Sequence, residues 1–206
     1  MALSFDLFGT LVAADRPDEP WAAVADALTD RGVAVPADWE AAYRSSHREY
    51  DRGREAPLPE HVSLALASRG VDVPERVARD AVLDAFDTPV TVRPDARAAV
   101  DTARERGPVA VCSNCSVPGL VERTLDRASL GPFDAVVTSV GCGWRKPHRE
   151  IFAATADALG VPLGELVHVG DDPRTDGGAG RVGARSIVLD ETPLATVASR
   201  CREGSL

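Results

Sequence analysis

Asp6 is the first residue of the chain with catalytic potential, because its carboxylate lies in a short apolar run, residues 3–8. A carboxylate at the end of a strand can attack an electrophilic centre and form a covalent intermediate. The alternative role for Asp6 is to cap the turn that Gly9 and Thr10 begin. Polar residues elsewhere in the chain bear on this choice.

Three acids, Asp171, Asp172 and Asp176, follow a second apolar run, residues 166–170. Like charges this close raise each other's pKa unless a cation relieves the repulsion. Carboxylate oxygens, together with water and phosphate, are the ligands that Mg²⁺ prefers. The alternative is a helix start that carries acids to match the helix dipole. That alternative explains Asp176 but not three acids together.

Lys146 is the only lysine of the chain, and the other 22 cationic side chains are arginine. An ammonium is a compact point charge, unlike the planar guanidinium of arginine. A single lysine in such a sequence indicates a position where geometry matters. We therefore interpret Lys146 as a residue with a specific role rather than a solvated charge before a helix.

Hydroxyl and amide side chains occur at two further places. Thr10 closes the run that contains Asp6, and Ser113 with Asn114 follows the apolar residues 109–112. These side chains suit the oxygens of a phosphoryl group, although Ser, Thr and Asn also favour turns for conformational reasons. For Asn114 the two interpretations stay equally open.

The elements that must position these residues alternate between strand and helix. We expect helices at residues 94–106, 117–128, 147–159 and from about 176, between strands at 3–8, 108–113, 133–139, 166–170 and 185–189. Such alternation is typical of a parallel sheet covered on both faces. Ligands of these sheets bind at the carboxyl ends of the strands, so Asp6, Ser113, the loop 139–146 and Asp171 should share one site.

Residues 15–90 have a different pattern, because helical periodicity recurs there without a strand-like run. Prolines and glycines divide this block into helices expected at residues 21–29, 37–50, 59–68 and 74–86. The sequence therefore predicts an α/β core, residues 1–14 and 91–206, with an all-helical domain of residues 15–90 inserted after the first strand. We expect two short linkers, near 12–16 and 88–92, to let this domain move as a lid.

The polar clusters, in this order and spacing, resemble the four motifs of the haloacid dehalogenase superfamily. The matching segments are residues 4–10 (SFDLFGT), 109–114 (VAVCSN), 146–147 (KP) and 167–172 (VHVGDD) with Asp176. The resemblance implies a Rossmann-like core and a helical cap domain of the subfamily I type. It also implies that Asp6 is the nucleophile and Lys146 the second catalytic residue, and that Thr10, Ser113 and Asn114 bind the substrate.

The same resemblance implies a metal site. Asp6, the backbone carbonyl of Phe8 and Asp171 would coordinate Mg²⁺ directly, and Asp176 would orient bound water or Lys146. Many relatives have serine at the position of Asp172, so its role stays open.

Phe8 departs from the family's phosphatases and mutases, which usually have a second aspartate at this position. That aspartate protonates the leaving group and then activates water, and such help is worth roughly 10²–10⁴ in rate. An aromatic residue here is similar to the family's 2-haloacid dehalogenases, which work without metal and release a halide that needs no proton. The three acids at 171, 172 and 176 favour a cation instead, because without one they would repel a carboxylate substrate.

Three hypotheses about function follow. The first is a Mg²⁺-dependent phosphatase that acts through an aspartyl-phosphate on a small phosphate ester, with a good leaving group or an acid borrowed from the cap or the substrate. The second is a 2-haloacid dehalogenase-like hydrolase. The third is a weakly active or non-catalytic relative that binds phosphate.

Composition limits the partners. The net charge of −9 repels nucleic acid and anionic membranes, so we expect neither as a partner. The resemblance implies a small phosphorylated molecule as partner, and the oligomeric state stays open. No apolar run approaches the ~20 residues of a membrane span, and the start of the sequence lacks the features of a signal peptide. We therefore expect a cytoplasmic enzyme.

Cys112 and Cys115 have a spacing that occurs in redox and zinc sites. No second pair and no nearby pair of histidines completes a zinc site. We interpret both as small buried residues in a reducing compartment.

Overall fold

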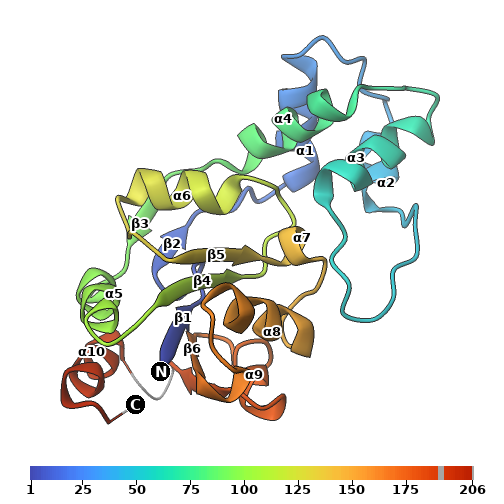
Figure 1. Ribbon diagram of the computed structural model, residues 1–206. Helices are drawn as coiled ribbons and strands as arrows, with labels where there is room; N and C mark the ends of the chain where they lie inside the picture. The colour runs from blue at the N-terminus through green and yellow to red at the C-terminus, as the bar shows by residue number, and fades with distance from the viewer. Residues whose placement is uncertain (190–192, 206) are drawn as a thin grey trace.

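The computed structural model describes residues 1–189 and 193–205, in which strands and helices alternate around a helical insert (Figure 1). The strands are β1 (Ala2–Phe5), β2 (Val12–Ala14), β3 (Val90–Val92), β4 (Val109–Ser113), β5 (Ala135–Thr138), β6 (Leu166–Gly170) and β7 (Arg185–Val188). The helices are α1 (Pro20–Thr29), α2 (Trp39–Arg44), α3 (Leu58–Ala67), α4 (Glu75–Phe86), α5 (Ala96–Arg104), α6 (Leu120–Ala128), α7 (Ser139–Cys142), α8 (Arg149–Ala158), α9 (Gly178–Arg181) and α10 (Leu194–Glu203), with a 3₁₀ turn at Leu163–Glu165.

Five strands form a parallel sheet in the order β5-β4-β1-β6-β7, which places β1 at its centre. Leu3 is in register with Val109 on one side and with Val167 on the other. The carboxyl ends of β1, β4 and β6 therefore meet at one edge, as the sequence predicts. The predicted fold class, a parallel α/β sheet with a helical insert after β1, is confirmed.

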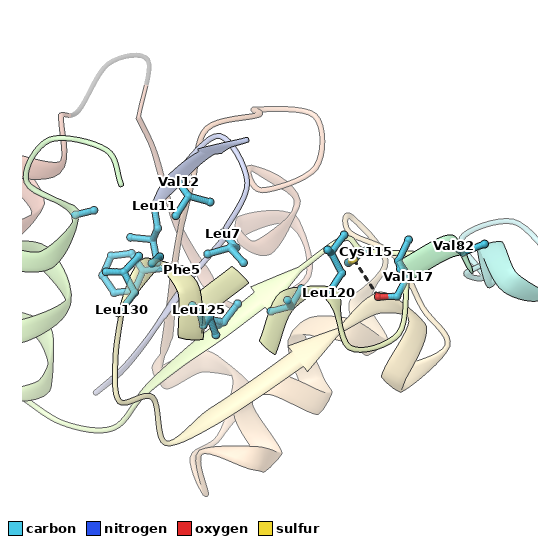
Figure 2. Packing of buried hydrophobic residues seen from close by; sticks show 14 of the residues in the cluster. Phe5, Leu7, Leu11, Val12, Val82, Cys115, Val117, Leu120, Leu125 and Leu130 are labelled. Carbon is cyan, nitrogen blue, oxygen red and sulfur yellow. Dashed lines mark hydrogen bonds between the residues drawn. The ribbon is translucent and has the colours of Figure 1, made fainter. Parts of the chain in front are cut away.

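Side chains alternate between the two faces of the sheet, and each face has its own apolar cluster. Phe5 and Val111 pack on the face that α5, α6 and α10 cover, whereas Ala110 and Cys112 pack against α8 and α9. Figure 2 shows Phe5 among the buried residues of the first cluster. Burying a large apolar side chain contributes roughly 1.5–3 kcal/mol, so both clusters hold the strands in register.

The helical insert consists of α1 to α4, which pack on one another beyond the end of the sheet (Figure 1). Its apolar residues join the first cluster of the core, because Val117 and Leu120 lie between the sheet and Val82 of α4 (Figure 2). Among the described residues, no helix has the length and apolar character that a membrane crossing requires.

The two predicted linkers contain the short strands β2 and β3. These strands pair in antiparallel fashion, with Val12 opposite Val92 and Ala14 opposite Val90. Three-residue strands are too short to show a period, so sequence patterns could not predict them. The division into a core and a separate cap domain stays a prediction, because the insert shares the apolar cluster of the core.

The helix expected over residues 37–50 is shorter than predicted, since α2 ends at Arg44. The backbone of Ser45 is extended (ψ 146°), and its hydroxyl donates to the carbonyl of Ala41. The His47 ring binds the carbonyl of Ala42 at 2.7 Å. Such local hydrogen bonds compete with helix formation. The chain therefore continues as a loop over residues 45–57, which returns to the core.

Candidate active site

A cavity of about 410 Å³ lies at the carboxyl ends of β1, β4 and β6. The core lines it with Asp6, Ser113 and Lys146, and the helical insert adds Glu55 and Phe86 to the lining. The sequence-predicted site is therefore assembled between the sheet and the insert.

Asp6 follows β1 directly, and its backbone N–H donates to the carbonyl of Val169 on β6 at 2.8 Å. This bond fixes the residue at the centre of the sheet edge. One carboxylate oxygen, Oδ1, lies 2.8 Å from Nζ of Lys146. Burial raises the pKa of Asp6, and the ammonium of Lys146 acts in the opposite direction.

Lys146 is almost fully buried, and its ammonium lies between two carboxylates. Nζ lies 2.8 Å from Asp6 and 2.6 Å from Oδ1 of Asp176. Burial alone would lower the pKa of Lys146, but the surrounding negative charges, Asp6 first among them, outweigh burial and raise it. The side chain therefore carries a proton throughout the ordinary pH range.

A buried histidine, His168, which the sequence analysis did not single out, binds the Asp176 carboxylate that contacts Lys146. The ring of His168 on β6 lies 3.0 Å from Oδ1 of Asp176 through Nε2 and 2.9 Å from Oγ of Ser4 through Nδ1. Burial lowers the pKa of His168, so the ring is neutral and donates its Nε2 proton to Asp176 while Ser4 donates to Nδ1. A polar residue at a buried strand position was the signal that could have revealed it.

Asp171 is held by Thr10, whose hydroxyl donates to Oδ1 of Asp171 at 2.9 Å. Gly9 makes this approach possible, because its φ is +94° and a Cβ there would lie 2.5 Å from the Asp171 carboxylate. The structure thus places the Thr10 hydroxyl on an acid of the site and not on the wall of the cavity. Its role in binding the substrate stays a prediction.

Asp6, Asp171 and Asp176 each offer a carboxylate oxygen, and these oxygens lie within 4.8 Å of one another. An all-oxygen donor set of this kind fits a hard divalent cation. Asp172 lies outside the triad, because hydrogen bonds from Arg174 occupy its carboxylate and lower its pKa.

Ser113 is the one predicted substrate ligand whose hydroxyl has no partner among the described residues. Its Oγ is buried, and the residue lines the cavity. A buried hydroxyl without a hydrogen bond costs about 1–3 kcal/mol, so this group is suited to a ligand in the cavity. The neighbouring Asn114 differs, because its amide is bound to the backbone of Lys146.

Phe8 lines the cavity and packs against the apolar core. Its ring can neither donate nor accept a proton. The replacement of an acid by Phe8 and the ligand role of its backbone carbonyl both stay predictions.

The two cysteines of the CxxC pair are buried and free. Burial raises the pKa of the Cys112 thiol and of the Cys115 thiol to about 11. Thiols of this kind are poor nucleophiles and metal ligands at neutral pH, which agrees with the interpretation as packing residues.

Comparisons with known proteins bear on this site. A family model described as a haloacid dehalogenase-like hydrolase matches residues 1–183. The chain is 31% identical over 144 residues to a phosphoserine phosphatase of Thermus thermophilus, covering 61% of this chain and 58% of that protein. It is 42% identical over 55 residues to the Escherichia coli 5-amino-6-(5-phospho-D-ribitylamino)uracil phosphatase YigB, covering 26% and 23%. The matches thus span less than two thirds of either relative.

Solved structures resemble the fold over nearly the whole chain. CbbY from Rhodobacter sphaeroides in complex with phosphate has a TM-score of 0.60 at 21% identity, covering 91% of this chain and 84% of that one. The L-2-haloacid dehalogenase from Xanthobacter autotrophicus has a TM-score of 0.55 at 24% identity, covering 98% and 82%. At these identities the likeness shows the fold alone.

Proposed function

The chain belongs to the haloacid dehalogenase-like hydrolase family, and we propose that it is a Mg²⁺-dependent phosphatase that forms an aspartyl-phosphate on Asp6. The observation that carries this proposal is the triad of Asp6, Asp171 and Asp176 around one point of the cavity. Three carboxylates so close favour a cation, and a cation suits a phosphate ester better than a bare carboxylate substrate.

The residues of the chain divide the work as follows. Asp6 attacks the phosphorus atom, the bond to the leaving oxygen breaks, and water then releases phosphate and regenerates the carboxylate. Lys146 holds Asp6 in place and balances negative charge that builds up on the phosphoryl group. The unpaired hydroxyl of Ser113 donates to a phosphoryl oxygen.

Asp176 holds the ammonium of Lys146 beside Asp6, because its Oδ1 lies 2.6 Å from Nζ of Lys146. His168 holds Asp176 in turn, because its Nε2 lies 3.0 Å from the same oxygen. Thr10 keeps Asp171 turned toward the same point. Asp6, Asp171 and the backbone carbonyl of Phe8 would hold Mg²⁺, with Asp176 orienting bound water or Lys146, and the cation would supply further charge neutralisation for the phosphoryl oxygens.

Phe8 favours a second candidate, a 2-haloacid dehalogenase-like hydrolase, because a halide leaves without a proton. The same residue is compatible with a third, a relative that binds phosphate with little or no turnover. The carboxylate triad counts against the second candidate. The Ser113 hydroxyl and the Asp6–Lys146 pair suit both the phosphatase and the relative that only binds phosphate.

One experiment separates the three. The purified protein is assayed against a panel of small phosphate esters with Mg²⁺ and with EDTA, and halide release from 2-chloropropionate is measured in parallel. Phosphate release that requires Mg²⁺ is the expected result. Halide release that is indifferent to EDTA would favour the dehalogenase. Saturable binding of inorganic phosphate without turnover of any ester would favour the third candidate.

A further inference from the structure

The helical insert brings a carboxyl group of its own to the cavity, on the loop of residues 45–57. This loop pairs with the core segment that precedes Lys146. The backbone N–H of Glu55 donates to the carbonyl of Gly143 at 3.0 Å, and the N–H of Arg145 donates to the carbonyl of Gly53 at 2.9 Å. Glu55 is therefore fixed by backbone hydrogen bonds beside the catalytic lysine's own segment.

The side chain of Glu55 is only 2% exposed, and it lines the same cavity as Asp6 and Ser113. The other described carboxyl groups on the wall are already explained: three form the triad, Asp172 is bound to Arg174, and Asp15 lies at the exposed surface. Glu55 is thus the buried carboxyl group of the cavity that the mechanism above leaves without a role.

The partners of Glu55 accept both of its protonation states. Oε2 contacts the hydroxyl of Ser139, and that hydroxyl also accepts from the N–H of Cys115 at 2.9 Å and lies 3.2 Å from the carbonyl of Cys115. When Glu55 is ionised, Ser139 donates to it. When Glu55 carries a proton, it donates to Ser139, and Ser139 donates to the Cys115 carbonyl. The hydrogen bond between Glu55 and Ser139 is kept in both states, because the single proton of the Ser139 hydroxyl turns from the Cys115 carbonyl to Glu55 when Glu55 is ionised.

The second oxygen of Glu55 has weaker constraints. Oε1 accepts from the N–H of Ala56 at 3.0 Å and lies 3.6 Å from Arg145, whose side chain is half exposed. The long, partly exposed contact with Arg145 holds Oε1 only weakly.

We propose that Glu55 is the general acid and base of the reaction, in place of the aspartate that Phe8 replaces. In the first step Asp6 bonds to phosphorus, the phosphorus–oxygen bond of the ester breaks, and the proton of Glu55 passes to the leaving oxygen to give an alcohol. In the second step Glu55 takes a proton from the water that attacks the aspartyl-phosphate, which restores both carboxyl groups and releases phosphate. The transfer runs directly or through one water. This role rests on the proposed phosphatase function.

The test compares two substrate classes on three proteins. Alkyl phosphates need a proton on the leaving oxygen, whereas aryl phosphates with acidic phenols do not. Glu55→Gln should lower kcat/KM for alkyl phosphates by about 10²–10⁴ and for such aryl phosphates by less than about tenfold. The matched control is Glu60→Gln, because Glu60 lies on α3, where it binds Arg48 and Tyr50 outside this cavity. This control should change neither class.

Phe8→Asp gives a measurement that leaves Glu55 in place. If Glu55 supplies the proton, the added aspartate should raise alkyl phosphate turnover little in the wild-type background and should restore much of it in Glu55→Gln. A large gain in the wild-type background, with no rescue of Glu55→Gln, would overturn the proposal.

The remaining outcomes separate the two proposals. A wild-type protein that hydrolyses both classes, and a Glu55→Gln variant that loses the same factor on each, would overturn the acid–base role and leave the phosphatase standing. A wild-type protein that hydrolyses neither class would overturn the phosphatase, and the role of Glu55 with it.

Discussion

The side-chain amide of Asn114 binds both backbone polar groups of Lys146. The N–H of Lys146 donates to Oδ1 of Asn114 at 2.7 Å, and Nδ2 of Asn114 donates to the carbonyl of Lys146 at 3.1 Å. Asn114 follows β4, so these two bonds tie the lysine to the edge of the central sheet. The backbone of Lys146 is thereby held in the position from which its ammonium contacts Asp6.

Asn114→Ala should therefore lower kcat by about 10²-fold, because small displacements of a catalytic group have effects of this size. KM should change little, since the amide is not free to bind the substrate. Steady-state kinetics on the best phosphate ester of the panel measure both constants. A variant that raises KM and keeps kcat would return Asn114 to the role of a substrate ligand.

Asp6→Asn should abolish hydrolysis, by roughly 10³-fold or more, because an amide is a poor nucleophile and a weaker metal ligand. The measurement is turnover with saturating Mg²⁺, together with mass spectrometry to detect the aspartyl-phosphate in the wild type. Thermal melting checks that the variant folds. Residual activity above about one tenth of the wild type would remove Asp6 from the role of nucleophile.

Lys146→Arg should also be damaging, although the charge is kept. Nζ lies 2.6 and 2.8 Å from two carboxylates in a nearly closed space, and the planar guanidinium has a different reach and bulk. We expect activity to fall by about 10²-fold and the variant to melt at a lower temperature. The control is Arg149→Lys, an exposed position on α8, which should change neither. A fully active Lys146→Arg enzyme would show that the single lysine is an accident of composition.

The sequence predicted the sheet, and the edge where the site residues meet, because both depend on local patterns. Apolar runs mark the buried strands, and polar residues directly after them must meet once the strands are parallel. The contacts of Asn114, Thr10 and Glu55 could not be predicted in this way. The contacts join residues that are 32 positions apart for Asn114 and Lys146, 84 for Glu55 and Ser139, and 161 for Thr10 and Asp171. Each contact depends on how the loops cross the edge of the sheet.

His168 gives the stability of the metal-free protein a pH dependence. Burial lowers the pKa of His168 in the folded state. Below about pH 6.5 the unfolded chain therefore binds a proton on this ring that the folded protein does not bind. The free energy of unfolding should therefore fall as the pH drops from 7 to 5. Asp176, whose pKa is lowered by His168 and Lys146 despite its burial, loses its contribution only at more acidic pH.

Urea unfolding at pH 5, 6 and 7 measures this slope, and His168→Gln is the variant that removes the titrating ring. Burial raises the pKa of Asp6, which acts in the opposite direction, so the difference between the two slopes reports the His168 ring together with its effect on Asp6. A slope that is the same in the variant would mean that His168 titrates freely in the folded state.

Trp144 bears on the predicted motion of the helical insert as a lid. Its ring stacks on His148 at 3.9 Å, and the guanidinium of Arg54 lies 4.6 Å from its centre, so a core residue holds the loop of the insert. A contact of this kind at the surface is worth about 0.5–1 kcal/mol, and it adds to the backbone hydrogen bonds of Glu55 and Arg145 that hold the same loop. Trp144→Ala should therefore favour the open position of the loop. Hydrogen exchange at residues 51–57 should become faster by about two- to fivefold, with a similar rise in KM and little change in kcat.

Adding inorganic phosphate and Mg²⁺ should slow this exchange in the wild type. Exchange in the wild type that is unaffected by phosphate, with the same protection in Trp144→Ala, would mean that the insert does not act as a lid.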